Sequence, residues 1–169
     1  MSNQEHSIKH QVKVFCTGGT IDKVYFDALS EYQIGEPVVG SILKEALVKF
    51  SFEVASILKK DSLEITDSDR EIILRQVSTD SCENILITHG TDTMINTAQC
   101  LAGIKDKTIV LTGAMQPARF RNTDAIFNIG YAISAAQHLP HGIYLAMNGQ
   151  IFTPDAVQKN RAAAQFEVK

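Results

Sequence analysis

Apolar runs of five to seven residues alternate with helical patterns along most of this chain, and each run ends in a small or polar turn. Such alternation is typical of a parallel sheet whose right-handed crossovers place helices on both of its faces. We therefore predict an α/β fold, a doubly wound, mostly parallel five-stranded sheet of flavodoxin-like size. The predicted strands are Val12–Cys16, Phe52–Leu58, Asn84–Thr88, Thr108–Thr112 and Gly142–Asn148.

The segments between these strands carry apolar residues at helical spacing, which predicts helices packed on the sheet. These helices are expected at 38–49, 66–78, 94–101 and 123–137. Beyond the fifth strand, Gln150–Thr153 is expected to form a short strand. Pro154 is then expected to open a turn or a helix that carries Lys159.

Composition favours one folded domain over the whole chain, 1–169. Of its 169 residues, 44% are hydrophobic and 21% are charged, values close to the average for globular domains. Residues 1–10 are polar and are expected to form a flexible lead-in. We expect no secretory signal in this lead-in, and no run of the sequence is long and apolar enough to cross a membrane.

The net charge and the cysteine pattern indicate which partners and which disulfide or metal sites to expect. A net charge of −3 offers no broad positive surface for a phosphate backbone, so we expect no nucleic-acid partner. Cys16, Cys82 and Cys100 are odd in number and show no CxxC spacing. This pattern favours reduced thiols in a cytoplasmic protein over a disulfide framework or a zinc site.

Two strand-end turns carry hydroxyl and carboxylate groups. Thr17-Gly-Gly-Thr20 follows the first strand, and Thr91-Asp92 follows the third. In open α/β sheets ligands bind beyond the carboxyl ends of the strands, so these groups are candidates for chemistry. The competing interpretation is that they are ordinary turn and cap residues. A phosphate loop is not indicated, because both GxxxxGK[ST] and GxGxxG spacings are missing.

Residues 22–35 are polar with interspersed aromatics and show no sustained period. Loops of this length in compact domains are often lids or binding loops, so we interpret the segment as an excursion over the site. Tyr25 and Tyr32 are the candidates for a functional phenol. For each tyrosine alone, a packed ring with its hydroxyl in water is the simpler alternative.

Three strand-end motifs together resemble the bacterial-type L-asparaginase/glutaminase family in order and spacing. They are Thr17-Gly-Gly-Thr-Ile21, Thr88-His-Gly-Thr-Asp-Thr-Met94 and Thr112-Gly-Ala-Met-Gln-Pro117. The resemblance covers nearly the whole chain and corresponds to the N-terminal domain of that family. It implies that the smaller C-terminal domain usual in the family is missing.

The resemblance also implies roles for individual residues. Thr20 is similar to the family's nucleophile, assisted by a loop tyrosine that Tyr32 matches better than Tyr25. Thr91 and Asp92 resemble the second threonine and its acidic partner, and Lys159 resembles the family lysine. The implied substrate-binding residues are Asp61, Ser62, Gly90, Thr91 and Asp92.

The activity implied by the resemblance is hydrolysis of the side-chain amide of L-asparagine or L-glutamine through an acyl-enzyme, with no metal or cofactor. Independent chemistry agrees on one point: a threonine hydroxyl is a weak nucleophile and needs a base, and a lysine is a base only when neutral. Leu63 and Gln116 depart from the residues usual in the family. The missing C-terminal domain and Leu63 motivate the alternative, which is a non-catalytic amino-acid-binding module or a subunit of a larger amidase assembly. By analogy with the family we expect a homodimer.

Overall fold

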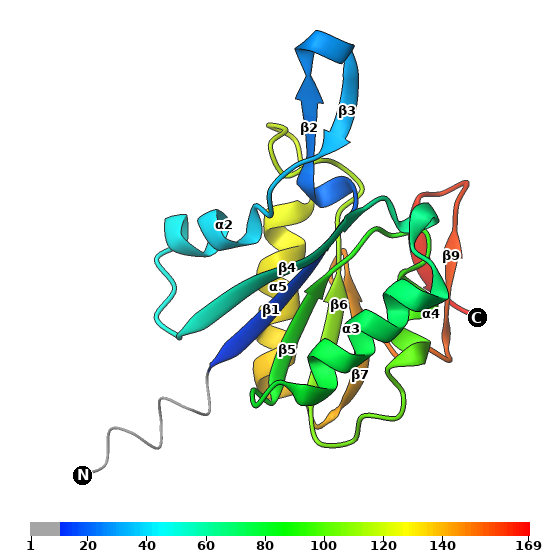
Figure 1. The fold of residues 1–169 in the computed structure, drawn as a ribbon. Coiled ribbons are helices and arrows are strands. Elements are labelled where there is room, and N and C mark those ends of the chain that lie inside the picture. The colour runs from blue at the N-terminus through cyan, green and yellow to red at the C-terminus, as the bar shows by residue number, and fades with distance from the viewer. Residues whose placement is uncertain (1–10) are drawn as a thin grey trace.

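A six-stranded sheet forms the centre of the molecule in the computed structural model, which describes residues 11–169 (Figure 1). The lead-in predicted for residues 1–10 lies outside the described residues. Strand order is β4-β1-β5-β6-β7-β8, with the first five strands parallel and β8 antiparallel to β7. The predicted parallel sheet is thus confirmed, with one antiparallel edge strand added. The strands are β1 (Val12–Gly18), β4 (Phe52–Lys60), β5 (Asn84–Thr88), β6 (Thr108–Thr112), β7 (Gly142–Met147) and β8 (Gln150–Phe152).

Helices cover both faces of this sheet (Figure 1). Adjacent residues of a strand point to opposite faces, so Val14 and Phe15 of β1 belong to separate hydrophobic clusters. One cluster packs α2 and α5 on the Val14 face, and the other packs α3 and α4 on the Phe15 face. The helices are α2 (Val39–Glu45), α3 (Asp67–Thr79), α4 (Met94–Cys100) and α5 (Ala125–His138).

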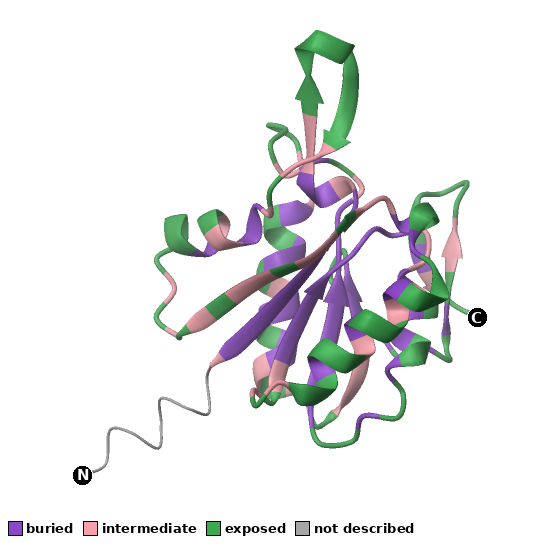
Figure 2. Cartoon of the chain, viewed as in Figure 1, coloured by how far each residue is buried: buried purple, intermediate pink, exposed green. Residues whose placement is uncertain are grey.

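The innermost strands lie between these two helical layers and are almost entirely buried (Figure 2). The sequence between them forms helices for local reasons as well. Thr66 begins α3 with a capping box, in which its hydroxyl accepts from the Asp69 N–H and its own N–H donates to the Asp69 carboxylate. No helix within residues 11–169 is both long enough and apolar enough to span a membrane.

Two antiparallel hairpins outside the central sheet complete the described fold, and the sequence patterns did not predict either as a hairpin. The first, β2 (Lys23–Phe26) with β3 (Glu31–Ile34), replaces the irregular excursion predicted for residues 22–35. It projects beyond the sheet and is largely exposed (Figures 1 and 2). The second is β9 (Val157–Asn160) with β10 (Gln165–Val168). Pro154 lies in a turn, and Lys159 lies on β9, so the helix considered for this lysine is wrong.

Candidate active site

The carboxyl ends of β1 and β5 meet where the sheet order changes direction. From β1 the chain crosses outward to β4, whereas β5 is followed by β6 and β7 on the other side. Such a switch point is where doubly wound sheets bind ligands. The two strand-end turns touch there, because a Cβ built on Gly19 would lie only 2.5 Å from the Gly90 Cα atom. Thr20 and Thr91, the residues that follow these glycines, therefore start from adjacent backbone.

Lys159 forms hydrogen bonds to both Thr91 and its neighbour Asp92. The Lys159 Nζ donates to Thr91 Oγ1 at 2.8 Å and to Asp92 Oδ1 at 2.7 Å. The lysine side chain is 13% exposed and that of Asp92 is 33% exposed, so the contact is shielded without being sealed. Arg161 approaches the same carboxylate oxygen at 3.9 Å but is mostly in solvent. The strand β9 thus supplies a cation to the end of β5 across 67 residues of sequence.

The turn after β4 holds the loop that carries Asp92 in place through hydrogen bonds. Ser62 is buried, its Oγ accepts from the Asp92 N–H at 3.2 Å, and its carbonyl accepts from the Thr93 hydroxyl at 2.7 Å. Asp61 precedes it and caps the turn, accepting from the Leu63 N–H at 3.1 Å. Ser62, one of the residues predicted to bind substrate, therefore also fixes the loop that carries Asp92. The side chain of Leu63 itself is exposed.

Thr20 lines a cavity of about 240 Å³ at the base of the first hairpin. Tyr32 is the tyrosine that lines this cavity, and Tyr25, its cross-strand partner, packs on it with ring centroids 5.4 Å apart. The Tyr32 ring also contacts Phe120, at 5.9 Å. Both phenols are about half exposed. Of the two candidates left open by the sequence, the geometry favours Tyr32.

His89, inside the second motif, is occupied by structural hydrogen bonds. Its Nδ1 lies 2.7 Å from the Gly90 carbonyl oxygen and its Nε2 lies 2.8 Å from Thr97 Oγ1. Complete burial lowers its pKa from 6.5 to about 4, with a smaller opposing effect of the Gly90 carbonyl. The imidazole is therefore neutral at physiological pH. It braces the turn that presents Gly90 and Thr91.

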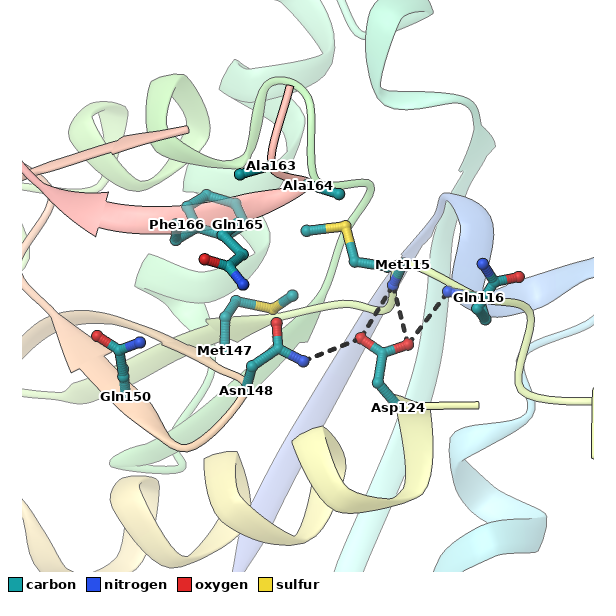
Figure 3. A pocket seen from close by; sticks show the side chains of 10 residues that line it. All are labelled: Met115, Gln116, Asp124, Met147, Asn148, Gln150, Ala163, Ala164, Gln165 and Phe166. Carbon is teal, nitrogen blue, oxygen red and sulfur yellow. Dashed lines mark hydrogen bonds between the residues drawn. The ribbon is translucent and has the colours of Figure 1, made fainter. Parts of the chain in front are cut away.

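A larger recess of about 460 Å³ lies beside this site, beyond Met115, whose sulfur is 3.9 Å from Thr91 Oγ1 (Figure 3). Asp124, just before α5, organises one wall. Its carboxylate accepts from the Met115 and Gln116 N–H groups and from the Asn148 side-chain amide, the last at 3.2 Å. Gln116 lines both the recess and the Thr20 cavity.

Two contributors to this region were not predicted from sequence. The sequence patterns gave Asp124 no role; it lies directly before α5, and its carboxylate binds the Met115 and Gln116 N–H groups and does not cap the helix. Lys23 lines the Thr20 cavity and pairs with Asp61. Its only sequence signal is its position three residues after Thr20. Within residues 11–169, no group of three or more histidine, cysteine, aspartate or glutamate side chains is arranged to hold a metal ion.

Comparison with known proteins identifies relatives of this chain. Residues 11–167 match the asparaginase N-terminal family. The glutaminase-asparaginase of Acinetobacter glutaminasificans is 31% identical over 167 residues, which is 89% of this chain and 50% of that protein. A component of the glutamyl-tRNA(Gln) amidotransferase of Methanococcus vannielii is 41% identical over a shorter stretch of 71 residues, covering 41% of this chain and 17% of that protein.

A solved structure gives the same result. The thermostable L-asparaginase of Thermococcus kodakarensis superposes with a TM-score of 0.80 at 30% identity, covering 94% of this chain and 51% of that chain. The chain thus spans about half the length of its asparaginase relatives. The family match over residues 11–167 includes the two strand-end turns, the β4 turn and Lys159. The chain belongs to the asparaginase N-terminal domain family.

Proposed function

We propose that this chain is an amidohydrolase that converts the side-chain amide of L-asparagine to the acid and ammonia, with L-glutamine as the second candidate substrate. The observation that carries the proposal is the Lys159 ammonium bound to both Thr91 and Asp92, beside the cavity that holds Thr20. The relatives named asparaginase and glutaminase-asparaginase support the same reaction class.

In the proposed reaction, Thr20 Oγ attacks the amide carbon and forms a tetrahedral intermediate. The N–H groups around Gly90 and Thr91 are the proposed donors to its oxyanion, a type of interaction worth roughly 3–4 kcal/mol per donor elsewhere. The threonine proton moves through Tyr32 to the amide nitrogen, which leaves as ammonia while an ester forms on Thr20. Water then cleaves the ester and restores the hydroxyl.

Thr91 and Lys159 are assigned to proton transfer on the other side of the substrate. In the observed ion pair the lysine donates to Thr91, so it can accept a proton from that hydroxyl only after losing one of its own. Asp92 pairs with Lys159, and its partly exposed carboxylate also binds the ammonium group of the substrate in the proposed reaction.

Release of ammonia from L-asparagine and from L-glutamine tests the proposal. We expect Thr20→Ala and Thr91→Ala each to reduce kcat/KM by at least about 10³-fold, because groups that act together in a catalytic unit are each needed. Thr79→Ala, at an exposed position of α3, is the matched control and should retain full activity. Turnover that survives both site substitutions would reject this mechanism.

The alternative is a non-catalytic amino-acid-binding module or a subunit of a larger amidase assembly. The observation that favours it is coverage, because the chain spans about half of its asparaginase relatives and also matches part of an amidotransferase component. Calorimetric binding of L-aspartate by a protein that releases no ammonia from either amide would support this alternative. Clear turnover by the isolated chain would reject it.

A further inference from the structure

Lys23 gives the Thr20 cavity a positive charge. It is the first residue of β2, and its side chain is 28% exposed. The other described residues around this cavity are neutral: Thr20, Tyr32, Gln116, Pro117 and Phe120. Among the described lining residues, Lys23 alone is charged, so its ammonium is the group in this cavity that can attract an anion.

Asp61 fixes the position of this ammonium. Lys23 Nζ lies 3.2 Å from Asp61 Oδ2, while the other carboxylate oxygen is anchored on the Leu63 N–H. Partial burial on its own would raise the pKa of Asp61, but the Leu63 N–H and the nearby Lys23 and Lys159 ammoniums lower it overall. Asp61 is therefore ionised near neutral pH. An ammonium has three N–H donors and Asp61 engages one of them, which leaves donor capacity for a second anion.

A negative charge, that of Asp92, lies on the loop that contacts the residue after Asp61. Ser62 follows Asp61 directly, and its hydroxyl accepts from the Asp92 N–H at 3.2 Å. Lys23 is thus paired with Asp61, and the loop that carries Asp92 is bonded to the next residue, Ser62. A free amino-acid amide carries a carboxylate and an ammonium on the same carbon atom. Consecutive residues of the β4 turn therefore connect one cation and one anion, the two charges that such a zwitterion needs as partners.

We propose that Lys23 is a specificity-determining residue that binds the carboxylate of the substrate, so that the chain selects amides that also carry a carboxylate. This inference rests on the proposed amidohydrolase function and names the substrate class of the same site. A purely structural role is the competing explanation, in which the Lys23–Asp61 pair only ties the base of the β2–β3 hairpin to the β4 turn.

A pair of substrates separates the two explanations. L-asparagine and 3-aminopropanamide have the same amide and amine, but only the first has the carboxylate. We expect Lys23→Met to raise KM for L-asparagine by about 10- to 100-fold, the usual effect of losing a hydrogen bond between charged groups, and to change kcat much less. The kcat/KM for 3-aminopropanamide should stay within about twofold of the wild type, the scatter expected where no interaction is lost.

Two further variants complete the design. Lys23→Arg keeps the charge and should recover part of the affinity for L-asparagine. Lys59→Met removes a lysine that pairs with Glu36 at the surface, and it should behave as the wild type. Equal losses on both substrates in Lys23→Met would show a structural role, and unchanged kinetics would show no role. Either result overturns the inference.

A binding measurement still tests the role of Lys23 if the protein hydrolyses no amide. In that case the proposed reaction fails, and calorimetry with L-aspartate replaces kinetics. A wild-type protein that binds L-aspartate, with at least about tenfold weaker binding in Lys23→Met, would support the carboxylate site without the reaction. Equal affinity in the two proteins, or no binding by the wild type, would reject it.

Discussion

Asp22 is a buried carboxyl group that the proposed chemistry does not use. It follows Thr20 by two residues and is only 2% exposed. One oxygen accepts from the Val38 N–H at 3.0 Å, and the other has no hydrogen-bond partner within the described structure. Burial raises the pKa of Asp22 to about 6, although the Val38 N–H and the Arg119 guanidinium act in the opposite direction. The carboxylate form is therefore costly to the fold.

This pKa predicts how stability depends on pH. A carboxyl group whose pKa is higher in the folded than in the unfolded chain adds stability below the unfolded value, near 3.8, and loses it as pH rises through about 6. The difference corresponds to at most about 3 kcal/mol. We expect Asp22→Asn to be more stable than the wild type at pH 7.5, by about 1–3 kcal/mol, with the advantage shrinking toward pH 4.

Urea unfolding at a series of pH values measures this difference. His89 acts with the opposite sign, because its lowered pKa costs stability as pH falls from 6.5 toward 4. That histidine is present in both proteins, so its effect cancels when the variant is compared with the wild type. A stability difference that does not change between pH 4 and 7.5 would contradict the assignment of the raised pKa to Asp22.

Among the structural elements, the strand-end turns depend on glycine for direct backbone contact. Gly19 has φ of 88°, in the region that favours glycine. A Cβ at this residue would lie 2.5 Å from the Gly90 backbone, and a Cβ at Gly90 would lie 2.6 Å from the Ser62 Cβ. The β1, β4 and β5 turns thus meet with no room for a methyl group. This close packing brings the Thr20 cavity and the Lys159 cluster together.

Gly19→Ala should therefore damage both stability and the site. We expect a loss of at least about 2 kcal/mol in the free energy of unfolding, since the methyl group clashes with backbone and the φ angle is unfavourable. Gly130→Ala is the matched control: Gly130 lies within α5 with nothing within 4 Å of the added methyl, and alanine there should stabilise the fold by about 0.5–1 kcal/mol. Denaturant midpoints of the two variants that move in the same direction would contradict this account.

The elements that rest on the core were predictable, and the two hairpins were not. The predicted bounds of Asn84–Thr88 and Thr108–Thr112 match β5 and β6, because a fully buried strand has a continuous apolar sequence. The β2–β3 hairpin buries little, so no alternation marks it. In β9, four residues are too few to show a period, although Val157 is buried.

The same distinction applies to the candidate site. The family resemblance pointed to Thr20, Thr91, Asp92 and Lys159, and in the structure Lys159 contacts Thr91 and Asp92. The pairing of Lys23 with Asp61 could not be predicted from the sequence. It depends on where the β2–β3 hairpin, which the sequence did not predict, begins relative to the β4 turn. Contacts made by strand ends follow from the topology of the sheet. The Lys23–Asp61 contact, made by the β2–β3 hairpin, required the structure.

Across the molecule, exposed large apolar side chains of the described residues gather at two places, besides single ones such as Leu47. The hairpin patch consists of Tyr25, Phe26, Leu29, Tyr32 and Phe120, of which Tyr32 and Phe120 line the Thr20 cavity. The α5 patch consists of Ile126 and Phe127, the latter stacked on Tyr131. Contiguous exposed apolar surface often marks an interaction site. Since the hairpin patch borders the Thr20 cavity, a second copy docked there would also shield the site from water.

We therefore expect the homodimer implied by the family resemblance to form through the hairpin patch. Sedimentation velocity over a range of protein concentrations should show a dimer that dissociates on dilution. The double variant Phe26→Ser/Leu29→Ser changes exposed hairpin residues, 46% and 57% exposed, and should shift the equilibrium toward monomer at least about tenfold, because burial of two large apolar side chains is lost. The matched double variant Ile126→Ser/Phe127→Ser on α5, at 58% and 59% exposure, should sediment as the wild type. A strict monomer at every concentration would reject the dimer, and a dimer weakened only by the α5 substitutions would place the interface on the helix instead.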